Sequence, residues 1–193
     1  KNYPQSRFLD EALYQRAELD FVQGNYSASV SGYSKLINAN KSSRFLPYGY
    51  LHRAASYYNL KDYNRTSNDY IAIIEKFPAH PLTNDVLLPL QESLNLAGRS
   101  AEFDKYMTQF KTANPGAKGI EIVEFESAKT LYFNQDYAKA IQGLGNYAAS
   151  YPESPRLSEA KYYQAESYFR LKDPQKALEI YYVLKADQSF LFA

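Results

Sequence analysis

The stretch IEIVEFESAKTLYFNQDYAKAIQGLGNYAASYPESP, residues 120–155, decides the fold of this chain. Its first part carries apolar or small side chains at spacings of three and four, at Ile122, Phe125, Ala128, Leu131 and Tyr132. Its second part repeats that spacing, at Tyr137, Ala140, Ile141, Leu144, Tyr147 and Ala148. Such spacing predicts two amphipathic helices, because residues three and four apart share one helical face. Gln135 and Asp136 interrupt the pattern, and the prolines after Tyr151 end it, since proline cannot donate a hydrogen bond within a helix.

The same pattern returns at a constant period of 37 residues. Stepping by this period from the first small residue reaches Ala17, Ala54, Gln91, Ala128 and Ala165. The same step from a large residue of the second helix reaches Tyr33, Tyr70, Met107, Leu144 and Tyr181. Repeats in constant register predict a stack in which each unit buries its apolar face against its neighbours. We therefore expect an all-α solenoid, one domain over residues 1–193, with units near 10–46, 47–83, 84–120, 121–157 and 158–193.

Each unit also carries the residues that a close helix pair and a tight turn require. The small residue midway along the first helix lets the two helices approach to about 8 Å. The predicted turns are Gly24-Asn25, Lys61-Asp62, Gly98-Arg99, Gln135-Asp136 and Lys172-Asp173. Glycine and asparagine tolerate the left-handed backbone that such turns use, and asparagine or aspartate can cap the next helix.

Composition limits the classes of partner. The chain has 22 basic and 21 acidic residues, which are mixed along its length, and a net charge of +1. Nucleic acids and anionic lipids favour a basic footprint, so we expect neither as a partner. No apolar run approaches the roughly 18 residues of a membrane span. The chain begins with Lys1 rather than methionine, so the missing signal peptide says little about localisation.

The sequence gives little support for catalysis or for a bound metal. Cysteine is absent, which excludes disulfides and thiolate metal sites. The two histidines are His52, within a predicted first helix, and His80, in a loop. No nucleophile-elbow, zinc-protease or phosphate-binding motif occurs. We therefore expect no enzyme activity, no cofactor and no metal, and we interpret both histidines as polar surface residues.

The pattern of residues within one unit resembles the tetratricopeptide repeat, or TPR. The similarity rests on small Ala128 and Ala140, large Leu144 and the proline at Pro152. The usual unit of 34 residues is lengthened here by three residues in the loop between units. The segments NQDYAKAI (134–141), YPES (151–154) and EAKYYQAESYFRLKD (159–173) resemble bacterial cell-envelope TPR proteins, of the Tol-Pal accessory and outer-membrane assembly lipoprotein types. The resemblance implies a right-handed solenoid and a periplasmic or outer-membrane-associated location.

The third unit departs most from the TPR pattern. It has Gln91, Ser100 and Phe103 where the pattern has alanine, tyrosine and a small residue. Its first helix also contains Pro89. A proline fits there only within the first turn, where its missing N–H has no partner to lose. Anywhere else it would kink the helix.

The resemblance implies that the first helices line a concave groove. By the family's pattern, the side chains that we expect to bind a partner there are Tyr14, Phe21, Tyr48, Tyr58, Phe125, Lys129, Tyr132, Phe133, Tyr162, Tyr163, Phe169 and Arg170. Tyrosine and phenylalanine could hold the apolar side chains of a peptide or stack on sugar rings. Some of these rings could instead pack between adjacent first helices. Chaperone-tail binding is not expected, because Tyr14, Glu18, Leu51 and Ala55 stand where such TPR domains place Lys and Asn.

Three functions remain open. The favoured interpretation is a non-enzymatic scaffold that binds a protein or peptide in the groove, within a bacterial envelope assembly. The alternatives are a glycan- or peptidoglycan-binding module, for which Asp85, Glu92 and Asn95 would supply polar contacts, and a structural spacer in a larger TPR protein. The chain begins within a YPQS loop at Tyr3 and ends near Phe190 and Phe192 without polar capping units. We therefore expect a segment of a longer repeat protein, whose uncapped ends could self-associate.

Overall fold

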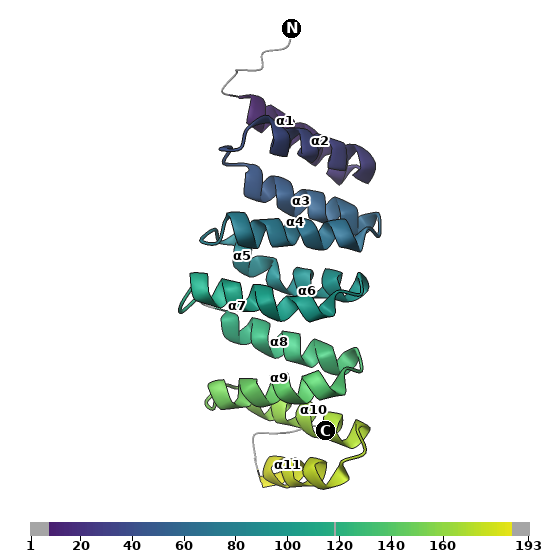
Figure 1. Ribbon diagram of the computed structural model, residues 1–193, viewed down its shortest axis with the longest axis vertical. Helices are drawn as coiled ribbons and strands as arrows, with labels where there is room; N and C mark the ends of the chain where they lie inside the picture. The colour runs from purple at the N-terminus through teal and green to yellow at the C-terminus, as the bar shows by residue number, and fades with distance from the viewer. Residues whose placement is uncertain (1–7, 118, 187–193) are drawn as a thin grey trace. The chain divides into compact units, whose positions relative to one another are not determined.

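The computed structural model describes residues 8–117 and 119–186, and all regular structure in these ranges is helical (Figure 1). The chain divides into two compact units, Lys1–Ala117 and Lys118–Ala193. The prediction of one continuous superhelical domain concerns how these units sit relative to each other, and it stays a prediction. Tyr3, Phe190 and Phe192, on which the expectation of uncapped ends rests, lie outside the described residues.

The first unit consists of successive helices, each packed against its neighbours in the chain. These helices are α1 (Leu9–Val22), α2 (Tyr26–Ala39), α3 (Leu46–Asn59), α4 (Tyr63–Lys76), α5 (Leu82–Asp85), α6 (Leu87–Leu96), the 3-10 turn η1 (Ser100–Glu102) and α7 (Phe103–Ala113). The second unit contains α8 (Ile120–Phe133), α9 (Tyr137–Ser150), α10 (Leu157–Arg170) and α11 (Pro174–Ala186). The two helices predicted within residues 120–155 are therefore confirmed as α8 and α9.

Close helix pairing rests on the small residues that the period identified. Ala17, Ala54, Ala128 and Ala165 are all buried. A Cβ atom placed on Gly32 of α2 would lie 2.7 Å from the Cβ of Ala17. Two helices can approach this closely only where both contribute a small side chain. The alanine of the first helix and the small residue of the second therefore define the contact within a unit.

The five predicted turns all use a left-handed backbone at their first residue. The positive φ angles are 76° at Gly24, 60° at Lys61, 73° at Gly98, 63° at Gln135 and 63° at Lys172. The spacing between successive positions is 37 residues in every case. In three of these turns the following aspartate accepts a hydrogen bond from a backbone N–H of the next helix, namely Asp62, Asp136 and Asp173. The predicted turns are thus confirmed in position, but lysine or glutamine rather than glycine or asparagine holds the left-handed conformation in three of them, and Asn25 makes no side-chain cap.

The third helix pair differs as its sequence suggested. Its first helix breaks at Val86 into α5 and α6, and Pro89 becomes the third residue of α6, within the first turn. There the missing N–H of proline costs no intrahelical hydrogen bond. Gln91 and Phe103 are both buried and stand where the other pairs have small residues. Their bulk explains why α6 and α7 pack less closely than the other pairs.

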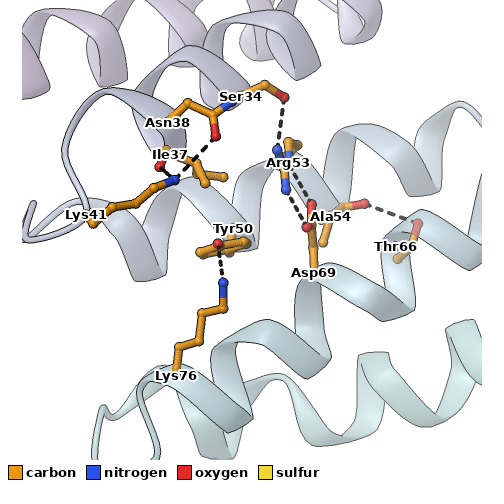
Figure 2. Close-up of polar contacts among 10 residues, drawn as sticks. All are labelled: Ser34, Ile37, Asn38, Lys41, Tyr50, Arg53, Ala54, Thr66, Asp69 and Lys76. Carbon is orange, nitrogen blue, oxygen red and sulfur yellow. Dashed lines mark hydrogen bonds and ion pairs between the residues drawn. The ribbon is translucent and has the colours of Figure 1, made fainter.

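A largely buried ion pair joins three helices of the first unit (Figure 2). The Arg53 guanidinium, on α3, donates to both carboxylate oxygens of Asp69 on α4, at 2.8 and 2.7 Å. It also donates to Ser34 Oγ on α2 at 2.9 Å. Burial raises the pKa of the Asp69 carboxyl, and the two hydrogen bonds from Arg53 oppose that shift. Because the charges are paired and hydrogen-bonded, their desolvation is compensated and the geometry of the three helices is specified.

The YPES segment has a structural role in the second unit. The hydroxyls of Tyr147 and Ser154 donate to one carboxylate oxygen of Glu121, at 2.9 and 2.6 Å. These hydrogen bonds lower the pKa of Glu121. The Tyr151 hydroxyl donates to Glu124 at 2.5 Å. The loop that ends one repeat is thereby bound to α8, the first helix of that same repeat.

Candidate functional site

The second unit brings together four of the ten aromatic residues predicted for a groove. We define the aromatic cluster as Tyr132 and Phe133 of α8 with Tyr162 and Tyr163 of α10. The centroids of Tyr132, Phe133 and Tyr163 lie 5.1 to 5.5 Å from one another, and Tyr162 lies 5.4 Å from Tyr163. All contacts are tilted or edge-on, the arrangements that ring quadrupoles favour. The cluster therefore joins the first helices of two successive repeats.

The cluster is only partly covered by protein. The three tyrosine rings are half-buried, whereas 60% of Phe133 is exposed. Phe169, one turn along α10 from Glu166, is 57% exposed, and Arg170 beside it is exposed as well. Exposed phenylalanine next to half-buried rings forms a contiguous apolar surface, and such surfaces commonly mark interaction sites. The tyrosines supply the support and Phe133 supplies the free surface.

Lys129 bridges the two helices of the cluster. Its Nζ lies 3.0 Å from a Glu159 oxygen on α10 and 3.8 Å from Glu126. The ammonium also lies 5.1 Å from the ring centre of Phe125 and 5.7 Å from that of Tyr163. Burial acts to lower the pKa of Lys129, but the hydrogen bond and charge of Glu159 outweigh it, so the pKa is raised. Lys129 is thus fully paired, and its role in this arrangement is to hold α8 against α10.

The prediction that Phe125 lines a groove is wrong. Only 1% of this residue is exposed, and its ring packs 5.4 Å from that of Tyr147 in the core between α8 and α9. The residues at the same repeat position, Tyr14 and Tyr162, are half-buried. Their hydroxyls need polar surroundings, whereas a phenylalanine ring can enter the core completely.

Two predicted residues of the first unit surround a histidine that we interpreted as a surface residue. His52 of α3 lies between the rings of Tyr14, Phe21 and Tyr33, with centroid distances of 5.8 to 5.9 Å. Its Nδ1 lies 2.9 Å from a carboxylate oxygen of Glu18, and the Tyr33 hydroxyl donates to the same oxygen at 2.5 Å. We call Tyr14, Glu18, Phe21 and Tyr33 the first cage.

Burial and the adjacent carboxylate control the ionisation of the first cage. Burial, followed by the charge of Glu18, raises the pKa of Tyr14 to about 12. Burial and the hydrogen bond to Glu18 raise the pKa of Tyr33 further. Both hydroxyls therefore remain protonated donors at neutral pH. In this cage Tyr14 and Phe21 pack α1 against α3, and the side chain that they contact is His52 of the same chain.

The remaining predicted residues, Tyr48 and Tyr58, are exposed on α3. The Tyr58 hydroxyl donates to Glu92 of α6 at 2.7 Å, and this hydrogen bond raises the pKa of Tyr58. The Tyr48 ring contacts that of His80 edge-on at 5.5 Å. Glu92 is one of the polar groups on which the glycan alternative rests, and here it serves a contact between successive repeats.

Neither a metal centre nor a membrane helix emerges from the described residues. Within residues 8–117 and 119–186, no three His, Cys, Asp or Glu side chains gather to form a metal-binding group. Of the helices in the described part of the chain, none has the length and apolar character needed to cross a membrane.

Comparisons with known proteins agree with this fold. Residues 124–154 and 159–188 match the family model of the tetratricopeptide repeat. These matches lie in the second half of the chain and cover less than half of it, so they identify tetratricopeptide repeats there, a fold that generally serves as a scaffold for protein–protein interaction. No curated protein matches the chain.

Several solved structures share the fold at low sequence identity. The MamA protein superposes with a TM-score of 0.64 at 9% identity, over 97% of this chain and 100% of that chain. The nearly identical TPR-like repeats of a Podosopora anserina protein give 0.57 at 16% identity, with 96% of each chain covered. YrrB, described as a TPR protein with an unusual peptide-binding site, gives 0.56 at 14% identity, over 91% and 86%. Identities this low show the fold alone.

Proposed function

We propose that this protein is a non-enzymatic scaffold that binds a protein or peptide through the aromatic cluster of α8 and α10. The observation that carries the proposal is the exposure of Phe133 above rings that the fold already holds in place. An exposed ring on a rigid support loses little conformational entropy on binding, and aromatic residues of this kind dominate interface energetics.

A peptide is the ligand class that this surface suits best. The rings lie on two successive first helices, so an extended segment or a helix could contact both. The peptide-binding site named for YrrB supports the proposal by analogy of fold. The acidic and amide groups that a sugar site would need, Asp85, Glu92 and Asn95, belong to the other compact unit.

We further propose a place for this scaffold in a bacterial envelope assembly, in the periplasm or at the outer membrane. The proposal rests on the similarity of the YPES and NQDYAKAI segments to envelope TPR proteins. Fractionation of the source cells with an antibody to this chain would test it. Recovery in the cytoplasmic fraction would contradict it.

The peptide site can be tested with a defined probe. Peptides would be selected from a random twelve-residue library on the wild-type chain, and their affinities measured by fluorescence anisotropy. We expect Phe133→Ala to weaken the selected peptides by about 30-fold, since truncating a central aromatic residue costs about 2 kcal/mol. Phe133 is exposed, so folding should be unchanged by circular dichroism.

Leu19→Ala is the control for this experiment. Leu19 is also a large exposed apolar residue on a first helix, but it lies on α1, in the other compact unit. Its substitution should leave the affinity unchanged. Equal affinities for wild type and Phe133→Ala, or failure to select any peptide, would contradict the proposed function.

A further inference from the structure

The four side chains of the first cage recur without change in the fifth repeat. Adding 148, or four periods of 37, to Tyr14, Glu18, Phe21 and Tyr33 reaches Tyr162, Glu166, Phe169 and Tyr181. We call this set the second cage. It involves α10 and α11, so it lies within the second unit.

The two cages also share their internal geometry. The Tyr181 hydroxyl donates a hydrogen bond to Glu166, as Tyr33 does to Glu18. The rings of Tyr162 and Tyr181 lie 6.4 Å apart at an interplanar angle of 55°, and those of Tyr14 and Tyr33 lie 5.9 Å apart, also at 55°. The recurrence is therefore structural as well as sequential.

The fold itself does not require this set of side chains. The second repeat has Leu51, Ala55, Tyr58 and Tyr70 at the same positions, and the fourth has Phe125, Lys129, Tyr132 and Leu144. Both of these repeats form the same helix pair. An aromatic triad around a carboxylate is thus a particular property of the first and fifth repeats, and packing within a repeat does not explain it.

The first cage shows what such a set of side chains binds. A histidine, presented from the middle of α3, brings Nδ1 to 2.9 Å from Glu18 while its ring contacts all three aromatic rings. In the described part of the chain, Glu18 interacts with both Tyr33 and His52, and Glu166 accepts a hydrogen bond from Tyr181. Phe21 is half-buried in its cage, and Phe169 is 57% exposed in the other.

The surface beside the second cage suits a helix. Within the second unit, two residues of α9 contact Gln164 of α10. Gln164 Nε2 donates a hydrogen bond to the Ile141 carbonyl at 3.2 Å. The same atom lies 2.8 Å from the place where a Cβ on Gly145 would stand. One period further along, the same positions hold Leu178 and Tyr182, both exposed on α11. A helix that docked there as α10 docks on α9 would cover this apolar pair.

We propose that the second cage binds a helix of a partner protein and receives a histidine side chain from it. The imidazole N–H would donate to Glu166, and its ring would contact Tyr162, Phe169 and Tyr181, as His52 does in the first cage. A flat N–H donor fits between ring edges and a carboxylate. The second cage shares Tyr162 with the aromatic cluster, but its other three members lie outside that cluster. The inference goes beyond the proposed function because it states the chemistry of the partner.

The chain itself supplies the probe for a test. A fluorescently labelled peptide of residues 45–60, FLPYGYLHRAASYYNL, carries His52 in its natural surroundings. Its binding to the full chain would be followed by anisotropy, beside a peptide with His52→Ala. Helices of this length are marginal in water, so the measurement should extend to millimolar protein or use a cross-linked helical peptide. We expect the histidine peptide to bind at least tenfold more tightly than the alanine peptide.

Two variants of the protein assign the binding to the cage. Glu166→Gln removes the charge that accepts from the imidazole, and Phe169→Ala removes an exposed ring without touching the core. Each should weaken the histidine peptide at least tenfold while leaving the alanine peptide unchanged. Phe133→Ala should leave both unchanged, which separates this result from failure of the aromatic cluster. Equal affinity of the two peptides, no binding of either, or no effect of both cage variants would overturn the inference.

Discussion

The left-handed turn at Gln135 allows a prediction whose sign and size both follow from the backbone. An L-residue held in this conformation costs about 1 to 2 kcal/mol, because its Cβ approaches the following carbonyl oxygen. Gln135 has a φ of 63° and an exposed side chain. Gln135→Gly removes the steric cost but increases the entropy of the unfolded chain by about 0.4 to 1 kcal/mol. We therefore expect a net stabilisation of about 0.5 to 1 kcal/mol.

Gly24 provides the reverse experiment at the same repeat position. Its φ is 76°, and a Cβ placed there would meet no heavy atom within 4 Å. Gly24→Ala therefore tests the backbone alone, without a clash against neighbouring atoms. We expect it to destabilise the protein by about 1 kcal/mol. The two substitutions should therefore change the free energy of unfolding in opposite directions, because both act on the same left-handed backbone position.

Urea unfolding followed by circular dichroism at 222 nm would measure both changes. For a chain of this size, 1 kcal/mol corresponds to about 2 to 4 °C in the melting temperature. Because repeats can unfold in part, hydrogen exchange of α8 and α9 should also slow in Gln135→Gly and remain unchanged in Gly24→Ala. A loss of stability in Gln135→Gly, or an unchanged Gly24→Ala variant, would refute the reasoning.

Three further predictions concern the core. Asp69→Asn should destabilise the first unit by about 3 to 5 kcal/mol in urea unfolding, because Arg53 is left buried without a carboxylate; a loss below 1 kcal/mol would show that water replaces the pairing. Gly32→Ala should cost about 1 to 3 kcal/mol, since the added Cβ would lie 2.7 Å from that of Ala17; unchanged melting would contradict this contact. Burial raises the pKa of Tyr70 to about 12, so the stability that its neutral hydroxyl contributes is present below pH 10 and is lost as the pH rises from about 10 towards 12. Absorbance at 295 nm should therefore not distinguish wild type from Tyr70→Phe near pH 10, and a difference there would refute the assignment.

The repeat fold was predictable because each of its determinants acts locally and recurs. Ala128 is buried against its partner helix, and the spacing of apolar residues along one helix is enough to place it there. Gln135 lies in a two-residue turn, and the short connection forces its backbone into the left-handed conformation. The break of the first helix of the third pair at Val86 was not predicted. Pro89 can stand only in a first turn, so the helix has to begin close before it, but the sequence does not show where the preceding turn ends.

The site was harder to predict because its contacts join residues from different repeats. The ion pair of Lys129 with Glu159 spans 30 residues, and the contact of His52 with Glu18 spans 34. The family's pattern placed Phe125 on the groove face. Whether a ring at this position enters the core depends on its neighbours and on whether it carries a hydroxyl, as Tyr14 and Tyr162 do. The signal for the cages was present in the sequence, as identical residues at Glu18 and Glu166 and around them, but only comparison between distant repeats reveals it.

One position of the repeat can change its chemistry with little effect on stability. It is the last residue of each first helix, and it is exposed in all five repeats, at Val22, Asn59, Leu96, Phe133 and Arg170. The residue seven positions earlier in the helix is half-buried in four of the five repeats, and only Gln15 is exposed. At this position His52 and Tyr163 make aromatic contacts. Because an exposed side chain contributes little to the core, its chemistry can change from aliphatic to amide, aromatic or cationic while the helix pair stays intact. Under the proposed function, the surface offered to a partner can therefore change one repeat at a time, and Phe133 is where this chain places an aromatic ring.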